Sequence, residues 1–151
     1  MRYLGLDCSS KAIHVVVLDG DGKVLDQQKF GSKLKTFEAR FPEIVTTFQA
    51  WISKIEVQHK VGVEAAIYIQ NARATIAISS VIGAAKASLL AAGYAPIEVD
   101  NRRWKKLVLG KGNASKEDIM TYAKNRWGDI FEEQDFADAA CIAEWRKEHG
   151  E

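Results

Sequence analysis

Four acidic residues have the types and spacing to do chemistry in this sequence: Asp7, Glu64, Asp135 and Asp138. Asp7 and Glu64 each follow a short apolar run typical of a buried strand, and the other two lie three apart in an alanine-rich, helical segment. Carboxylates at two strand ends, facing an acidic pair on one helix face, would form a set of hard oxygen ligands. Such a set suits Mg²⁺ or Mn²⁺ and phosphodiester hydrolysis.

Each of these acids, taken alone, also has a purely structural explanation. Asp7 and Glu64 could end their strands in solvent or on turn amides, and Asp135 could cap its helix. Asp138 is harder to explain in this way, because it lies among Ala residues on the side of the helix expected to pack. A buried carboxylate without a partner is very costly. A shared cation explains all four residues together.

Length and composition indicate one globular domain over residues 1–151. The chain is 47% hydrophobic and 27% charged, and its longest apolar stretches are interrupted by charges or Gly, so we expect no membrane span and no leader segment. Cys8 and Cys141 fit neither a zinc spacing nor a disulfide framework. We therefore expect a reduced, cytoplasmic setting.

The net charge of +1 conceals two segments of opposite sign. Residues 101–116 carry six basic residues and no acid, whereas residues 128–151 have a net charge of −6. This division favours a protein that grips a polyanion with one part and holds metal ions with another. The alternative is surface charge that happens to segregate.

Hydrophobic periodicity predicts ten elements. Three strands joined by short turns come first, and a hairpin signal at Asp19-Gly20-Asp21-Gly22 connects the second to the third. The later strands alternate with helices, so the order predicts a mixed α/β fold. The expected strands are 2–7, 12–18, 23–30, 57–64 and 96–99, and the expected helices are 37–55 with Pro42 in its first turns, a long helix from the N-cap Asn71 to Gly93, then 101–108, 115–126 and 134–148.

Several segments together resemble a known family. Tyr3-Leu4-Gly5-Leu6-Asp7-Cys8-Ser9-Ser10, Gly62-Val63-Glu64, Leu109-Gly110-Lys111-Gly112-Asn113-Ala114-Ser115-Lys116 and Asp135-Phe136-Ala137-Asp138-Ala139-Ala140 are similar to RuvC-type Holliday junction resolvases, of the RNase H-like superfamily. The resemblance runs from Met1 to about Trp145. It implies a mixed five-stranded sheet, three antiparallel strands followed by two parallel ones, flanked by helices.

The resemblance also implies the roles of individual residues. Asp7 would bridge two Mg²⁺ or Mn²⁺ ions, Glu64 would bind one ion, and Asp135 and Asp138 would bind the other. The protein would act as a homodimer, largely through the helix after Asn71, and would cut branched DNA in paired nicks that leave 5′-phosphate and 3′-hydroxyl ends. No small-molecule cofactor is implied. The expected DNA contacts are Arg102, Arg103, Lys105, Lys106, Lys111, Lys116, Tyr68 and Asn71.

Two departures from the family pattern indicate a phage or otherwise divergent branch. Bacterial members usually have Asp-Pro-Gly-Ser where this chain has Asp7-Cys8-Ser9-Ser10. The aromatic residue expected three positions after Glu64 is replaced by Ile67, and Tyr68 is next. Tyr68 could stack on an unpaired base or pack on its own domain.

Other functions are compatible with parts of the pattern. Gly5-Leu6-Asp7 with the glycine hairpin is also similar to the first phosphate loop of actin-like sugar kinases, but the chain is too short for the second domain of such enzymes. A protein that binds branched DNA without cutting it remains an alternative. So does a nuclease for RNA–DNA hybrids, which uses the same metal chemistry. His14, His59 and His149 are scattered, and we expect no role for them.

Overall fold

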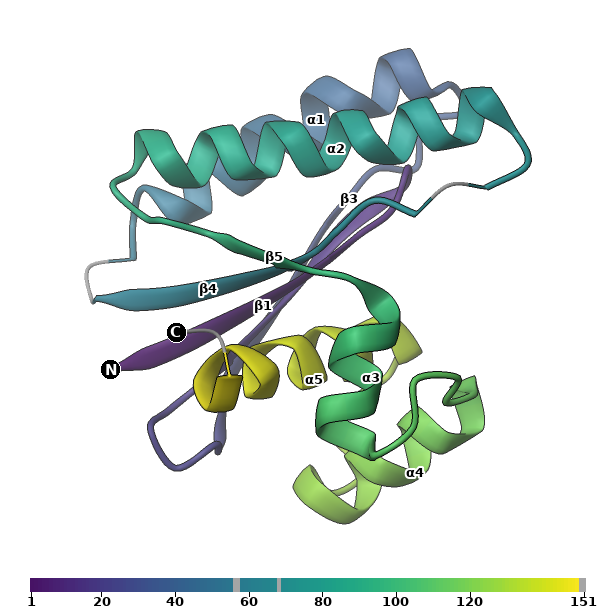
Figure 1. Ribbon diagram of the computed structural model, residues 1–151. Helices are drawn as coiled ribbons and strands as arrows, with labels where there is room; N and C mark the ends of the chain where they lie inside the picture. Colours follow the sequence, from purple (N-terminus) through teal and green to yellow (C-terminus); the bar gives the residue numbers. More distant parts are fainter. Residues whose placement is uncertain (56–57, 68, 150–151) are drawn as a thin grey trace.

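The computed structural model describes residues 1–55, 58–67 and 69–149 (Figure 1). All ten expected elements occur in the expected order. The strands are β1 (Arg2–Cys8), β2 (Ala12–Leu18), β3 (Val24–Gly31), β4 (His59–Glu64) and β5 (Ile97–Val99), and the helices are α1 (Phe37–Ile52), α2 (Ala72–Ala91), α3 (Asn101–Leu109), α4 (Lys116–Trp127) and α5 (Gln134–His149).

The strands form one mixed sheet in the order β3-β2-β1-β4-β5. The first three strands are antiparallel neighbours, whereas β4 and β5 join β1 in parallel, as predicted. Helices α1 and α2 cover one face of the sheet, and α5, with α3 and α4 beyond it, covers the other (Figure 1). Asp7 and Glu64 therefore end two adjacent parallel strands at the same edge.

Side-chain alternation along the central strands divides the core into two layers. Leu4 and Leu6 of β1 belong to the cluster under α1 and α2. Val16 and Leu18 of β2 belong to the cluster under α5. All seven residues of β2 are buried, as expected for a strand with helices on both faces. The α5 layer holds the acidic pair of the predicted site.

Local capping signals set several helix ends. The side chain of Asn71 accepts a hydrogen bond from the Ala74 amide, so it is the N-cap that the sequence predicts. Ser115 and Asp118 form the predicted capping box. Asp135 lies in the first turn of α5, which begins at Gln134, and so does not cap that helix.

Most predicted boundaries agree with those observed to within one residue, and two larger differences concern α1 and β4. The helix expected to reach residue 55 ends at Ile52, where Ser53 takes the C-cap position. The fourth strand begins at His59, and Val57, where it was expected to begin, lies outside the described residues.

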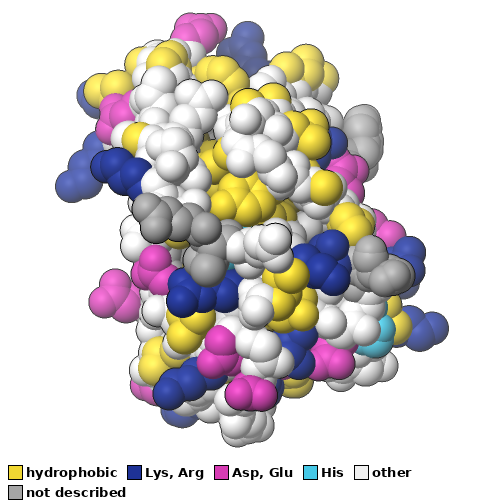
Figure 2. Space-filling view, turned by 90° about the vertical axis from the view of Figure 1, so that its left-hand side faces the viewer, with side chains coloured by type: hydrophobic (Ala, Val, Ile, Leu, Met, Phe, Trp, Pro, Cys, Tyr) yellow, Lys and Arg dark blue, Asp and Glu magenta, His cyan; other side chains and the backbone are white. Residues whose placement is uncertain are grey.

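One helix is long and apolar enough to cross a membrane by length and composition alone, although the sequence predicts no membrane span. Helix α2 has 20 residues and a mean hydropathy of 1.6, which meets that criterion. A core helix of a globular domain meets it as well: α2 buries six residues, four of which, including Val81 and Leu89, belong to the first layer. In Figure 2 hydrophobic side chains reach the surface in the upper half, at the height of α1 and α2 in Figure 1.

Candidate active site

Three of the four predicted carboxylates meet at one point. Asp7 at the end of β1 and Asp135 and Asp138 on the first turns of α5 each offer an oxygen, and these oxygens lie within 4.8 Å of one another. Three carboxylates at this separation form a ligand set for a hard divalent cation. The spacing of three between Asp135 and Asp138 puts both on the helix face that meets the sheet.

Gly5 of β1 has no side chain, and this allows α5 to lie close to the strand. A Cβ atom on Gly5 would come 1.9 Å from the carbonyl oxygen of Ala139 and 2.4 Å from the amide nitrogen of Ala143, both in the backbone of α5. Gly62 of β4 is less crowded but also close to α5, since its Cβ would lie 3.2 Å from that of Arg146. The two glycines therefore let the helix backbone rest on the sheet, and this contact brings the start of α5 to Asp7.

The carboxylates of the cluster repel one another, and a bound cation would relieve this repulsion. Burial, with the negative charges of Asp138, Glu64 and Asp135, raises the pKa of Asp7 well above its ordinary value. Burial and the charge of Glu64 raise the pKa of Asp138 to about 7. Among the residues that the structure describes, no Lys, Arg or His forms an ion pair with either carboxylate. This donor set therefore fits Mg²⁺ or Mn²⁺, whose charge would offset the repulsion.

Glu64 lies beside this cluster and is held from a different direction. Its charge acts on Asp7 and Asp138, but it is not one of the three residues whose oxygens meet within 4.8 Å. Its Oε2 atom accepts a hydrogen bond from Trp104 Nε1 at 2.5 Å and another from Asn101 Nδ2 at 3.1 Å. Oε1 is the oxygen that these two hydrogen bonds leave available.

Sequence reasoning missed both of these hydrogen-bond donors. Asn101 and Trp104 lie three apart on α3, which places them on one helix face. A signal for Trp104 was present, because it is the one aromatic residue in a very basic helix and a buried indole N–H needs an acceptor. Trp104 is fully buried. The partner itself could not be inferred without the fold.

Comparisons with known proteins agree with this geometry. The family model for the crossover junction endodeoxyribonuclease RuvC matches residues 4–144. The chain belongs to the RuvC family. RuvC of Paraburkholderia phytofirmans is 30% identical over 123 residues, which are 80% of this chain and 68% of that protein. RuvC of Trichlorobacter lovleyi is 26% identical over 147 residues, covering 95% and 83% of the two chains.

A solved structure shows the same fold. RuvC of Thermus thermophilus, in a complex with a Holliday junction substrate, superimposes with a TM-score of 0.79 at 19% identity. The match covers 95% of this chain and 90% of that one. The RNase H-like fold expected for a RuvC-type protein is therefore confirmed.

The basic segment of this RuvC-family chain lies on α3 and the loop after it. Lys105 is near enough to the acidic cluster to lower the pKa of Asp138. Lys111 pairs with Asp118 at 3.1 Å, so the loop is tied to the first turn of α4. The predicted contacts that are exposed and form no ion pair with any described residue are Arg102, Arg103, Lys106 and Lys116.

The two predicted DNA contacts that are not basic are Asn71 and Tyr68. Asn71 is exposed, and its side-chain oxygen caps α2, which leaves its role in DNA binding a prediction. Tyr68 lies outside the described residues. The thiols of Cys8 and Cys141 have pKa values raised by burial, so neither supplies a thiolate to the site.

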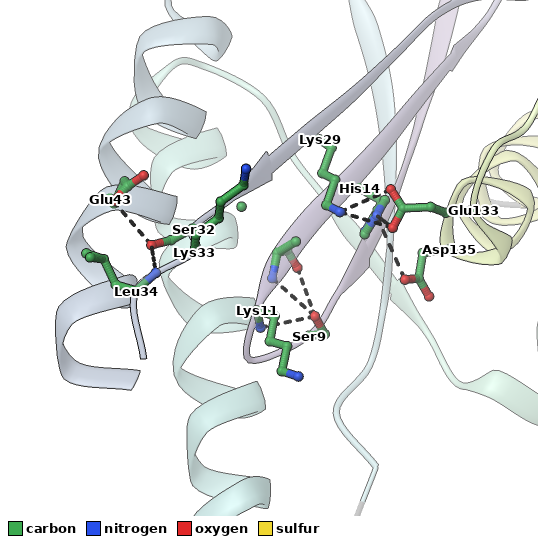
Figure 3. A pocket seen from close by; sticks show the side chains of 12 residues that line it. Ser9, Lys11, His14, Lys29, Ser32, Lys33, Leu34, Glu43, Glu133 and Asp135 are labelled. Carbon is green, nitrogen blue, oxygen red and sulfur yellow. Dashed lines mark hydrogen bonds and ion pairs between the residues drawn. The ribbon is translucent and has the colours of Figure 1, made fainter. Parts of the chain in front are cut away.

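Next to the acidic cluster lies a histidine to which the sequence analysis assigned no role. His14 of β2 is only 3% exposed, and its Nε2 atom lies 3.4 Å from Glu133 Oε1 and 3.8 Å from Asp135 Oδ2 (Figure 3). Burial lowers the pKa of His14, although Asp135 and Glu133 act in the opposite direction. The imidazole therefore faces a predicted metal ligand directly.

Proposed function

We propose that this RuvC-family endodeoxyribonuclease cuts branched DNA such as a four-way junction, using two Mg²⁺ or Mn²⁺ ions. Asp7, Glu64, Asp135 and Asp138 would hold the ions, with Asp7 shared between them. The observation that carries the proposal is the meeting of Asp7, Asp135 and Asp138 within 4.8 Å without a cationic partner for Asp7 or Asp138 among the described residues. The names of the relatives support the substrate class.

The residues of this chain would orient and balance charge around the reacting phosphate. Divalent ions at such a centre activate water and stabilise the leaving oxygen of an in-line displacement. Trp104 and Asn101 would keep Glu64 in one rotamer, and the backbone contact at Gly5 would keep the two Asp residues of α5 in place. Lys105 and the exposed cations of α3 would attract the DNA backbone toward the cluster. The expected products carry 5′-phosphate and 3′-hydroxyl ends.

Cleavage of labelled DNA tests the proposal. Four-way junction, flap, linear duplex and RNA–DNA hybrid are each incubated with Mg²⁺, Mn²⁺ or EDTA, and the nicks are mapped. We expect nicking of branched DNA that EDTA abolishes. Junction binding without nicking would favour the non-catalytic alternative, and preferential cutting of the hybrid would favour a ribonuclease H-type enzyme.

Asp7→Asn is the decisive variant. We expect it to lower the cleavage rate at least about a thousandfold, because metal ions contribute several kcal/mol to such reactions. Junction binding should survive. Asp129→Asn is the matched control, since Asp129 is an exposed acid outside the cluster. Full cleavage by Asp7→Asn would contradict the proposal.

The second part of the proposal is a homodimer formed through α2. One face of this helix is exposed and consists mostly of small and apolar residues: Ala72, Ile76, Ser79, Gly83, Ala87 and Leu90. Lys86 at its border is paired with Glu98. Ile76 is 65% exposed and Leu90 is 61% exposed, and nothing lies within 4 Å of a Cβ built on Gly83. Small residues at helical spacing allow two helices to approach closely, and a dimer would present two active sites to a two-fold symmetric junction.

Sedimentation velocity tests this interface. Ile76→Glu should convert a dimer to a monomer, because it places a charge in the centre of the apolar face. Leu25→Glu is the control, since Leu25 of β3 is 44% exposed on another surface and should leave the dimer intact. A wild-type protein that sediments as a monomer at micromolar concentration would rule out a stable dimer.

A further inference from the structure

One row of polar residues crosses the sheet on the face covered by α5. Asp7 of β1 is the register partner of His14 on β2, and His14 is the register partner of Lys29 on β3. Directly paired residues on adjacent strands point to the same face. The row therefore runs under the start of α5, from the acidic cluster toward the edge strand, with His14 in its centre.

The contacts of His14 link this row to α5. Its Nε2 atom faces Glu133 and Asp135, while its ring meets Phe136 edge to face with the centroids 4.8 Å apart. Lys29 Nζ holds both oxygens of Glu133, at 3.0 and 3.1 Å. Lys29, His14, Glu133 and Asp135 line a cavity of about 790 Å³. Figure 3 shows these four side chains grouped together at one side of it. A carboxylate can only accept a hydrogen bond, so Nε2 is the donor when His14 bonds to either acid.

The four predicted ligands differ in how firmly their side chains are held. Glu64 accepts two hydrogen bonds from α3, and Asp7 and Asp138 are largely enclosed. The side chain of Asp135 is 50% exposed and lies in the first helical turn, so fewer packing contacts restrict its rotamer than for Asp7 or Asp138. His14 is buried and supported on both sides, so it is the rigid group beside the least constrained ligand.

We propose that His14 is a positioning residue for Asp135: its Nε2–H directs one Asp135 oxygen so that the other faces the shared metal centre. The proposal rests on the proposed function. The Nε2 atom lies 3.4 Å from Glu133 Oε1 and 3.8 Å from Asp135 Oδ2, the second beyond hydrogen-bond length, and contacts of this kind tighten when the bound state forms. Lys29 and Glu133 would fix the orientation of the ring. Loss of such a supporting group typically costs 10–100-fold in metal affinity or activity.

Two other roles for His14 are possible, and each predicts a different experimental outcome. His14, Glu133 and Asp135 also place their ligand atoms within 4.8 Å of one another, so His14 could bind an ion directly. Lys29 argues against this, because its ammonium group already occupies both oxygens of Glu133. The remaining reading is a buried histidine that only supports packing.

Three variants separate these readings. His14→Phe keeps a ring against Phe136 but removes the N–H donor, and His14→Gln keeps a donor of similar reach. Val16→Ala is the control, because Val16 is a fully buried residue of the same strand and faces the same helix. Thermal melts establish that each variant is folded.

The primary measurement is a titration of the protein with Mn²⁺ in the absence of DNA, in which electron paramagnetic resonance detects the bound ion. We expect His14→Phe to weaken Mn²⁺ binding about 10–100-fold, and His14→Gln to recover most of the loss. The Mg²⁺ concentration for half-maximal nicking should rise in parallel, while junction affinity in Ca²⁺ stays within about twofold of wild type. Val16→Ala should leave metal affinity unchanged.

Each contrary result has a defined meaning. Wild-type Mn²⁺ affinity in His14→Phe, or an equal loss in Val16→Ala, would show that His14 acts only through packing. An equal loss in His14→Gln would show that an N–H donor at this position is not what Asp135 requires. A ¹⁴N coupling to bound Mn²⁺ that disappears in His14→Gln would show direct coordination instead. A wild-type protein that binds Mn²⁺ but does not nick DNA would overturn the proposed function, and the Mn²⁺ titration would still decide the role of His14.

Discussion

Replacing Asp138 by Asn should stabilise the metal-free protein at alkaline pH and remove most of its response to Mg²⁺. Burial and the charge of Glu64 raise the pKa of Asp138 from 3.8 to about 7. A group whose pKa is raised on folding contributes stability that is complete below its unfolded pKa and is lost as the pH rises through its folded pKa. Asp138 should therefore destabilise the metal-free fold progressively between about pH 4 and pH 7.

The size of the effect follows from the two pKa values. Their separation of roughly three pH units corresponds to about 4 kcal/mol if the whole shift is realised. Water reaches the partly exposed neighbour Asp135, which screens the cluster, so we expect about 2 kcal/mol. Asn is nearly isosteric with protonated Asp, and Asp138→Asn should therefore match wild type near pH 4 and exceed its stability by about 2 kcal/mol at pH 8.

Urea denaturation in EDTA at a series of pH values measures this difference directly. Adding Mg²⁺ at pH 8 should stabilise wild type by about 2.7 kcal/mol at a hundred times its dissociation constant, and Asp138→Asn by much less. Asp129→Asn is the control and should show no difference that depends on pH. Equal stability of Asp138→Asn and wild type at pH 8 in EDTA would refute the assignment of Asp138 as a buried, unpaired carboxylate.

Two further predictions concern the groups that hold the site together. Trp104→Phe should lower the cleavage rate about 10–100-fold with little effect on junction affinity, because it removes a charge-assisted hydrogen bond to Glu64 of about 1.5–3 kcal/mol; an unchanged rate in single-turnover assays would contradict this role. Gly5→Ala should destabilise the fold by about 3 kcal/mol or more in urea denaturation, since its Cβ would meet the backbone of α5. In the monomeric Ile76→Glu background, Gly83→Ala should instead stabilise α2 by up to about 1 kcal/mol, because no atom of the same protomer lies within 4 Å of its Cβ.

Much of the fold was predictable because its signals are local. The run of β-branched residues in Ala12–Leu18 predicted β2 with both of its ends, and Asn71 and Ser115 marked the starts of α2 and α4 by hydrogen bonds within one turn. The end of α1 was less predictable, because Ile55 continues the apolar spacing beyond the last helical residue, Ile52. Periodicity reports which residues are apolar, but the C-cap at Ser53 decides where the helical hydrogen bonds stop.

Some residues of the candidate site were also predictable from local signals in the sequence. Asp7, Asp135 and Asp138 could be inferred from their positions at element ends, and the enclosed Asp138 was the residue least easily explained without a cation. The resemblance to RuvC-type resolvases then implied the mixed sheet, in which β1 and β4 are paired in parallel. Residue types, local spacing and element order were thus sufficient for the fold class, the metal-binding chemistry and the resemblance to RuvC-type resolvases.

Only the tertiary structure decided what holds these carboxylates. Trp104 lies 40 residues from Glu64, and His14 lies 121 residues before Asp135, so no local periodicity connects either pair. Their contacts depend on strand register and on the close approach of α5 at Gly5. Register is a property of two strands together, and helix–sheet distance is set by the side chains of both layers. For that physical reason His14 had no assignable role in the sequence and acquires one in the fold.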